Sequence, residues 1–198
     1  FLTYFEVFLT KQIYMLKVNR LLSTKIKFNQ LSKNFSKWKC IYIRSDISPL
    51  ISGGAMAHTV GVLDQLQEVL FSVDICSLSD MSQVARKASC HIVCVPERLK
   101  EFPEFLELYN TDLIAAKVEQ ILKTSEKNSS LFIYQRYSLN NFSSLLIAQK
   151  YKIPTVIEYN GSDVWVREKW GRGLKDPNFS KKIEKLILEK STMIVCIS

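Results

Sequence analysis

The sequence predicts an α/β fold in which helices cover both faces of a parallel β-sheet. From residue 39 onward, short apolar runs rich in Val, Ile and Tyr alternate with longer segments whose apolar residues recur every three or four positions. The first pattern is typical of buried strands and the second of amphipathic helices. Strands separated by helices of this length form parallel sheets. The predicted fold class is therefore a Rossmann-like, doubly wound sheet of about six strands with right-handed crossovers, preceded by an amphipathic helical segment.

Residues 1–38 are predicted to be a basic, amphipathic helical extension of a domain at 39–198. Gly and Pro are absent from this extension, and apolar residues recur at helical spacing at Leu2, Phe5, Leu9, Ile13 and Leu16. Lysines interrupt the pattern before the roughly 20 apolar residues that a membrane span needs, and no signal-peptide pattern is present. Two interpretations stay open. The segment binds an anionic membrane surface, at the inner face of a membrane, or it packs on the domain with a solvated outer face.

Each element of the domain has its own local pattern. Strands are predicted at 40–44, 73–78, 91–95, 131–135, 155–159 and 192–197, where β-branched and apolar residues dominate. Helices are predicted at 55–70, 82–88, 102–123, 141–151 and 179–190. The residues between 159 and 179 are predicted to be a polar region, with Trp165, Trp170, Gly171 and Gly173, that leads to the helix at 179–190.

The composition limits the class of protein. The chain has 198 residues, of which 47% are hydrophobic and 23% charged, with only 6 Gly and 5 Pro, as in a globular domain. Five cysteines without regular spacing argue against a disulfide framework and fit a reducing, cytoplasmic compartment. Cys90, His91 and Cys94 share one predicted strand that alternates faces and has no fourth ligand, so no metal site is predicted.

The positive charge is confined to the N-terminal segment. The net charge is +8, and residues 1–39 hold eight basic residues against one acidic residue. The remainder is nearly neutral and has no groove that combines basic and aromatic residues. A nucleic-acid partner is therefore not predicted.

A strand at 155–159 runs directly into the polar turn Asn160-Gly161-Ser162-Asp163. Gly reaches positive φ, and Asn and Asp side chains bond nearby backbone, so these residues suit a tight turn. In open α/β sheets, ligands bind just outside the carboxyl ends of the strands. The turn is thus either a candidate site or only a good strand-to-helix turn.

Gly53 and Gly54 follow the first strand and precede a helix. Glycines there let backbone N–H groups approach an anion, to which the helix N-terminus adds partial positive charge. His58 lies in the first turns of the same helix, where an imidazole can bond a hydroxyl or a phosphate, or can simply fill surface or core. Many loops also use Gly for geometry alone.

Arg136 follows the strand at 131–135 and so lies at another carboxyl end. Its guanidinium can hold a phosphate or carboxylate, or pair with a neighbouring acid such as Glu158. The dinucleotide fingerprint Gly-x-Gly-x-x-Gly and the Gly-Lys-Ser/Thr of a P-loop are absent, which disfavours dehydrogenases and P-loop nucleotidases. A Gly-x-Ser-x-Gly elbow is also absent, so a Ser-His-Asp hydrolase has little support.

Three short motifs occur in a fixed order: Gly53-Gly-Ala-Met-Ala-His-Thr-Val-Gly61, Tyr134-Gln-Arg-Tyr-Ser138 and Ile157-Glu-Tyr-Asn-Gly-Ser-Asp-Val-Trp165. In this order the sequence resembles the N-terminal domain of family 4 glycosyltransferases, the retaining two-domain enzymes of the GT-B fold. The resemblance covers residues 39–198, and its most specific part is the third motif. Related sequences with this run are often enzymes of surface-polysaccharide biosynthesis.

The resemblance implies transfer of a hexosyl group from a nucleotide-sugar donor to a glycan or lipid-linked acceptor, without a metal or other cofactor. Gly53 and Gly54 would face the donor diphosphate. The acceptor and sugar cleft would be lined by His58, Arg136, Glu158, Asn160, Gly161, Ser162 and Asp163. No catalytic residue is assigned, because the family's catalysis is ascribed to the donor phosphate and electrostatic stabilisation. Many members have His where this chain has Asn160, which cannot act as an acid or base at neutral pH.

The family's donor site, with two glutamates eight residues apart, lies in a second domain that would follow residue 198. Glu184 and Glu189 have a different spacing and do not replace it. The segment alone is therefore expected to be inactive. The alternative is a non-catalytic Rossmann-like module that binds a partner or a small metabolite.

Overall fold

A six-stranded, all-parallel sheet with the order β3-β2-β1-β4-β5-β6 forms the centre of the computed structural model. The structure describes residues 2–29, 33–34, 37–46, 53–84, 87–124, 130–171 and 173–197. The strand order and the flanking helices confirm the predicted Rossmann-like, doubly wound fold. The elements are α1 (Leu2–Ser23), β1 (Trp38–Arg44), α2 (Gly54–Val69), β2 (Ser72–Ser77), β3 (Ser89–Ile92), the 3₁₀ turn η2 (Glu97–Leu99), α3 (Pro103–Thr124), β4 (Ser130–Arg136), α4 (Ser143–Tyr151), β5 (Thr155–Tyr159), α5 (Asp163–Trp170), α6 (Pro177–Lys190) and β6 (Met193–Cys196).

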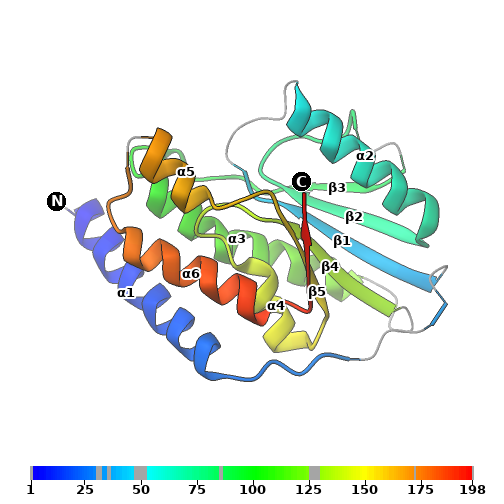
Figure 1. The fold of residues 1–198 in the computed structure, drawn as a ribbon, viewed down its shortest axis with the longest axis horizontal. Coiled ribbons are helices and arrows are strands. Elements are labelled where there is room, and N and C mark those ends of the chain that lie inside the picture. Colours follow the sequence, from blue (N-terminus) through cyan, green and yellow to red (C-terminus); the bar gives the residue numbers. More distant parts are fainter. Residues whose placement is uncertain are drawn as a thin grey trace.

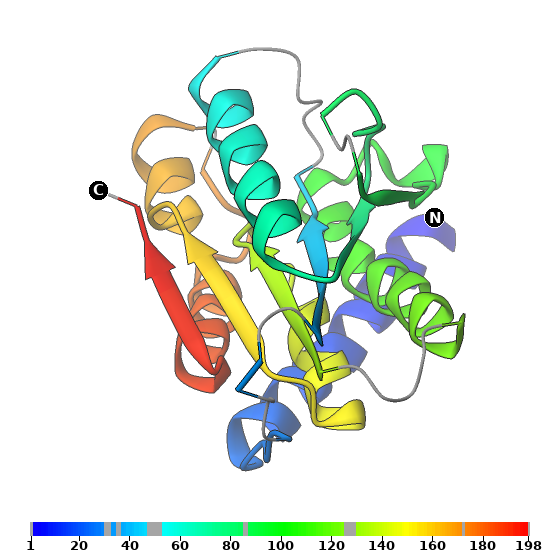
Figure 2. The ribbon, with the colours of Figure 1, turned by 90° about the vertical axis from the view of Figure 1, so that its right-hand side faces the viewer.

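Helices lie on both sides of the sheet, as Figures 1 and 2 show. Apolar side chains fill the layer on each side. Side chains alternate along β1, so Cys40 and Tyr42 enter the layer beneath α2, while Ile41 and Ile43 enter the layer with α3 and α4. Helix α6 lies on the same side as α3 and α4. Central strands such as β1 are buried on both faces, which explains why their sequences are continuous apolar runs.

Helix α1 packs against α6 and α3 as part of the core. Tyr14, Val18 and Leu21 are at most 1% exposed and join the apolar cluster of α6. The Tyr14 hydroxyl donates to Asp112 of α3 at 3.0 Å, and the Lys17 ammonium donates to the same carboxylate at 2.7 Å. No helix among the described residues has the length and apolar character to cross a bilayer.

The opposite face of α1 is apolar and exposed. Its large side chains are Tyr4, Phe5, Phe8, Leu9, Ile13 and Leu16. Four of them belong to the apolar stripe read from the sequence, so the helix packs through a different face from the one that this stripe marks. A packed amphipathic helix is expected to expose a polar face to solvent, whereas the exposed face of α1 carries these large apolar side chains.

The prediction of a helix at 82–88 is wrong, and other elements differ from the prediction in extent. Residues 82–84 form a turn rather than the start of a helix at 82–88, because Asp80 accepts a hydrogen bond from the Ser82 N–H at 2.8 Å and so competes with helical bonding; residues 85–86 lie outside the described part. The polar region after β5 contains a helix, α5, which begins where Ser162 accepts the Trp165 N–H at 3.1 Å. The third strand occupies 89–92 rather than 91–95. Of the predicted loops, 47–52 and 125–129 lie outside the described residues.

Candidate functional site

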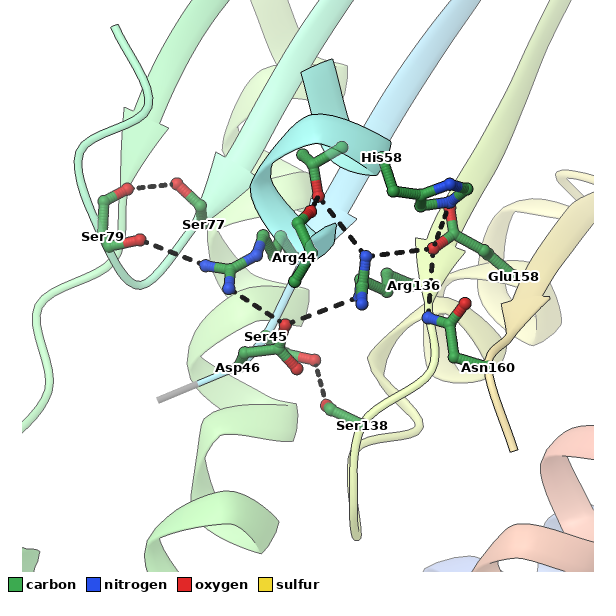
Figure 3. Close-up of polar contacts among 12 residues, drawn as sticks. Arg44, Ser45, Asp46, His58, Ser77, Ser79, Arg136, Ser138, Glu158 and Asn160 are labelled. Carbon is green, nitrogen blue, oxygen red and sulfur yellow. Dashed lines mark hydrogen bonds and ion pairs between the residues drawn. The ribbon is translucent and has the colours of Figure 1, made fainter. Parts of the chain in front are cut away.

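The candidate site lies at the carboxyl edge of the sheet, where the strand order reverses between β1 and β4. The crossover from β1 leads to α2 on one face, and the crossover from β4 leads to α4 on the other, which leaves the strand ends open. Figure 3 shows the side chains that converge there from β1, α2, β4 and β5. They include Arg44, Asp46, His58, Arg136, Glu158 and Asn160.

Glu158, at the end of β5, is fully buried and is the centre of the polar network. Its Oε2 accepts from the Tyr134 hydroxyl at 3.1 Å, and its Oε1 lies 3.3 Å from Arg136 Nη1. Asn160 Nδ2 donates to Oε1 at 3.2 Å, and His58 Nε2 lies 3.1 Å from the same atom. A buried carboxylate needs such partners, because an unpaired charge would lose its hydration without compensation.

Asp46 extends this network across the sheet. Its Oδ2 lies 3.2 Å from Arg44 Nη2 and 3.7 Å from Arg136 Nε. Burial raises the pKa of Asp46, while the two guanidinium groups oppose that rise. Arg44, Asp46, Arg136 and Glu158 thus form a row of alternating charge, which we call the charge row, with the partly exposed His58 beside its end (Figure 3).

Helix α2 begins at this edge with the two glycines. Gly53 is the N-cap residue, and its φ of 91° favours glycine. As a glycine it has no side chain that could cap the helix. A Cβ added at Gly53 or Gly54 would meet no described atom within 4 Å. Thr59 ties the helix to β4, since its hydroxyl donates to Ala55 O at 2.8 Å and accepts from Arg136 at 3.4 Å. Among the described residues, no side chain caps the start of α2 and none lies within 4 Å of the space beside its glycines, as an anion site at a helix N-terminus requires.

The Asn160–Asp163 turn divides into two parts. Asn160 is exposed and contacts Glu158, and Gly161 has a φ of 111°. Ser162, in contrast, caps α5 and donates to Glu184 Oε2 at 3.0 Å. Glu184 Oε1 also accepts from two tyrosine hydroxyls, those of Tyr137 and Tyr159. Ser162 and Glu184 consequently hold the turn in place.

Asp163 begins a second group of acids beside the charge row. Burial, followed by the negative charge of Asp46, raises the pKa of Asp163 to about 6. On α3, burial raises the pKa of Glu107 to about 7 against the opposing effect of Arg167, whose Nη2 lies 2.8 Å away. These carboxyl groups can gain or lose protons near neutral pH.

The structure brings four of the predicted site residues into direct contact: His58, Arg136, Glu158 and Asn160. Gly53 and Gly54 lie at the same edge, while Ser162 and Asp163 are engaged with α5 and α6. Two roles were considered for Arg136, holding a ligand or pairing with a neighbouring acid, and the structure shows its pairing with Glu158. The sequence interpretation missed Arg44, Asp46 and Tyr134. Arg44 is the last residue of β1, and Asp46 follows it by two positions. The rule that ligands bind at the carboxyl ends of strands would therefore have found both.

The network consists of hydrogen-bond donors and acceptors and of paired charges. The described residues contain no group of three potential metal-ligating side chains. His91, which lies outside this site, is 2.8 Å from Asp74. The exposed Asn160 amide and the His58 imidazole are groups suited to sugar hydroxyls.

The sequence was also compared with known proteins. No protein-family model matches it, and no curated protein matches it. The functional interpretation therefore depends on the geometry of the site and on the motifs.

Proposed function

We propose that this chain is the acceptor-binding N-terminal part of a retaining glycosyltransferase. Its complete enzyme would move a hexosyl group from a nucleotide-sugar donor to a glycan or lipid-linked acceptor. The observation that carries the proposal is the meeting of the Gly53-Gly54 helix start with His58, Arg136, Glu158 and Asn160 at one edge of a doubly wound sheet. These are the residues that the three motifs single out.

In this proposal the two glycines approach the donor diphosphate through backbone N–H groups, aided by the helix dipole. His58 and Asn160 bond hydroxyls of the sugar or acceptor, and buried Glu158 and Arg136 orient them. Two indole rings on α5 extend the surface. Trp165 is 48% and Trp170 77% exposed, and their ring centroids are 5.0 Å apart. Exposed aromatic faces of this kind can stack against sugar rings.

The test is transfer from a panel of nucleotide sugars by the full-length protein, since the donor site of the proposed enzyme belongs to a second domain. Gly54→Asp should abolish transfer, because its carboxylate would repel the donor diphosphate at the start of α2. Gly61→Asp, on an exposed position of the same helix, is the matched control and should retain transfer. Transfer that persists at full rate in folded Gly54→Asp would reject the role of the glycine loop.

The alternative is a non-catalytic Rossmann-like binding module. One observation favours it: the charges of Arg44, Asp46, Arg136 and Glu158 already pair with one another. If no nucleotide sugar supports transfer and none binds the full-length protein, the enzyme proposal fails and this alternative stands.

We further propose that α1 attaches the protein to an anionic membrane surface at the cytoplasmic face. The support is the exposed apolar face of α1, which is followed by the exposed basic residues Lys25 and Lys27. An amphipathic helix with such a face lies in the headgroup region of a bilayer, and basic residues add attraction to anionic lipids.

The double variant Phe5→Ser/Phe8→Ser should bind phosphatidylglycerol vesicles at least about tenfold more weakly, because each Phe contributes burial of apolar surface. High salt should weaken binding of the unaltered chain. Phe71→Ser removes an equally exposed Phe outside α1, directly before β2, and is the control. Equal vesicle binding by the double variant and the control would exclude this role of α1. Substitution is preferable to deletion because α1 belongs to the core.

A further inference from the structure

The face of the sheet that α2 covers is open at β5 and β6. Figure 2 looks onto this face, where α2 lies in front of the middle of the sheet and no helix of the described residues lies in front of β5 and β6. On the opposite face, α6 packs against the same part of the sheet. Parallel sheets are normally covered by helices on both faces, so one covering element is missing here.

Apolar side chains of β6 point to this open face. The register pairs Met193 with Val156 of β5, and paired residues of neighbouring strands point to the same side. Val156 packs against the apolar cluster beneath α2, so Met193 faces the α2 side. Val195 follows two residues later and faces the same side. Met193 is 58% exposed and Val195 is 37% exposed, so the surface of the sheet is apolar here.

Helix α2 forms one wall of this open region. A groove of about 420 Å³ follows a single stripe along the helix, lined by His58, Gly61, Val62, Gln65, Leu66 and Val69. Two lining residues, Val62 and Leu66, pack against the same apolar cluster as Val156. The stripe therefore borders the floor made by Val156, Met193 and Val195. We call this groove and its floor the α2–β6 trough.

The width of the trough suits one α-helix. Two neighbouring strands provide a floor of roughly 10 Å, and a helix with its side chains is about 10–12 Å across. A helix laid beside α2 would complete the layer that covers this face.

The rim of the trough is acidic. Asp64 and Glu68 are exposed, and each lies three residues after a lining residue, Gly61 or Gln65, and so stands next to it on the helix. Helix α2 contains no Lys or Arg, and β6 contains no charged residue, although the net charge of the chain is +8. Charge complementarity therefore favours a basic partner.

We propose that the α2–β6 trough binds an amphipathic, basic α-helix of a partner protein. The apolar face of that helix packs on Met193, Val195 and Leu66. Its Lys or Arg residues pair with Asp64 and Glu68. Helices that bind in grooves make such contacts through apolar residues spaced three or four positions apart. The site is independent of the proposed glycosyl transfer.

The test is NMR titration of the ¹⁵N-labelled chain with a designed helical peptide of about 18 residues, about 27 Å long, with leucines on one face and lysines on the other. The peptide should bind with a Kd of about 100 μM or tighter and shift the amide signals of α2 and β6. A scrambled peptide of the same composition has no apolar face and should bind at least about tenfold more weakly. A peptide with glutamates in place of the lysines should also bind at least about tenfold more weakly.

Met193→Ser removes an exposed apolar side chain from the floor and should weaken binding of the lysine peptide about tenfold. Val166→Ser, at an exposed position of α5, is the matched control and should leave the Kd unchanged. Asp64→Asn/Glu68→Gln should weaken binding about fivefold, because two charge pairs at an exposed rim are lost. The amide spectrum of each variant reports whether it is folded.

Two results would overturn the site: amide shifts confined to α1, whose exposed face is also apolar, or equal binding by Met193→Ser and Val166→Ser. Equal affinity for the lysine and glutamate peptides would overturn the basic character of the partner. Sedimentation velocity of the chain alone tests the other occupant. A dimer that Met193→Ser dissociates would show that a second copy fills the trough, and the proposal of a partner helix would fail.

Discussion

Glu158 is the residue on which the contacts at the carboxyl edge converge. The side chains of Tyr134, Arg136, Asn160 and His58 all lie within hydrogen-bond distance of its carboxylate. Glu158 lies at the end of a strand and is completely buried, and Arg136 compensates its negative charge. Arg136 depends on this carboxylate and on Asp46 for compensation of its own charge.

Glu158→Gln should lower the free energy of unfolding by roughly 2–4 kcal/mol, because it leaves the Arg136 guanidinium, whose side chain is only 14% exposed, with one charged partner fewer. Urea denaturation at neutral pH measures the change. The control is Glu189→Gln, which alters a half-exposed carboxylate on α6 and should change stability by less than about 0.5 kcal/mol. In a double-mutant cycle, Arg136→Gln should lose less stability when combined with Glu158→Gln than in the original chain. Additive losses would contradict the pairing.

At the scale of elements, helices α3 and α5 are joined by an ion pair that lies beside further acids. Arg167 of α5 binds Glu107 of α3 at 2.8 Å, and Asp163 at the start of α5 adds a nearby negative charge. Lys175 after α5 also approaches α3 through Glu104. The contact between α3 and α5 thus depends on side chains whose charge changes with pH.

The stability of the protein should fall as the pH rises from about 5 to about 8. The folded pKa of Glu107 is raised from 4.5 to about 7 and that of Asp163 from 3.8 to about 6, so the native state binds protons that the unfolded state has released. Their contribution is complete below the unfolded pKa values and is lost as the pH rises through the folded values of about 6 and about 7.

Glu107→Gln should reduce this fall in the free energy of unfolding by an amount on the order of 1 kcal/mol, measured by urea denaturation across the same pH range. Glu97→Gln, at an exposed position in η2, is the control and should keep the original slope. An unchanged slope in Glu107→Gln would contradict the raised pKa.

At the scale of the whole molecule, α1 and the sheet share a continuous interior. Val18 and Tyr14 of α1 belong to the same apolar cluster as Phe142 before α4 and Ile157 of β5. An element that contributes to a common core is expected to unfold with it in one cooperative transition.

Val18→Ala should therefore lower the free energy of unfolding by about 2 kcal/mol and shift the transitions seen by tryptophan fluorescence and far-ultraviolet circular dichroism together. The fluorescence reports Trp38, Trp165 and Trp170, none of which lies on α1. Leu16, also on α1, is 69% exposed. Leu16→Ala is therefore the matched control and should change the free energy of unfolding little. A fluorescence transition that Val18→Ala leaves unchanged would show that α1 unfolds separately.

The sequence alone determined the fold class and most of the elements. Buried parallel strands and amphipathic helices have local patterns with different periods, so β5 was predicted at 155–159, where the structure has it. The rule for strand ends likewise selected Arg136 and Asn160. His58 came from the helix that follows the glycines, and Glu158 from the third motif. The structure joins all four in one network. The missed helix α5 had a local signal in its Ser162 cap, which was read only as part of a turn.

Only the tertiary structure decided which of these groups contact one another. The packed face of α1 depends on the apolar surface that α6 presents, and the stripe of Phe5, Leu9 and Leu16 could not reveal that this face stays outside. The pairing of Arg136 with Glu158 and the raised pKa values of Asp163 and Glu107 likewise arise between separate elements. Periodicity is encoded within a few neighbouring residues, whereas burial and charge pairing are set by distances between residues far apart in the chain.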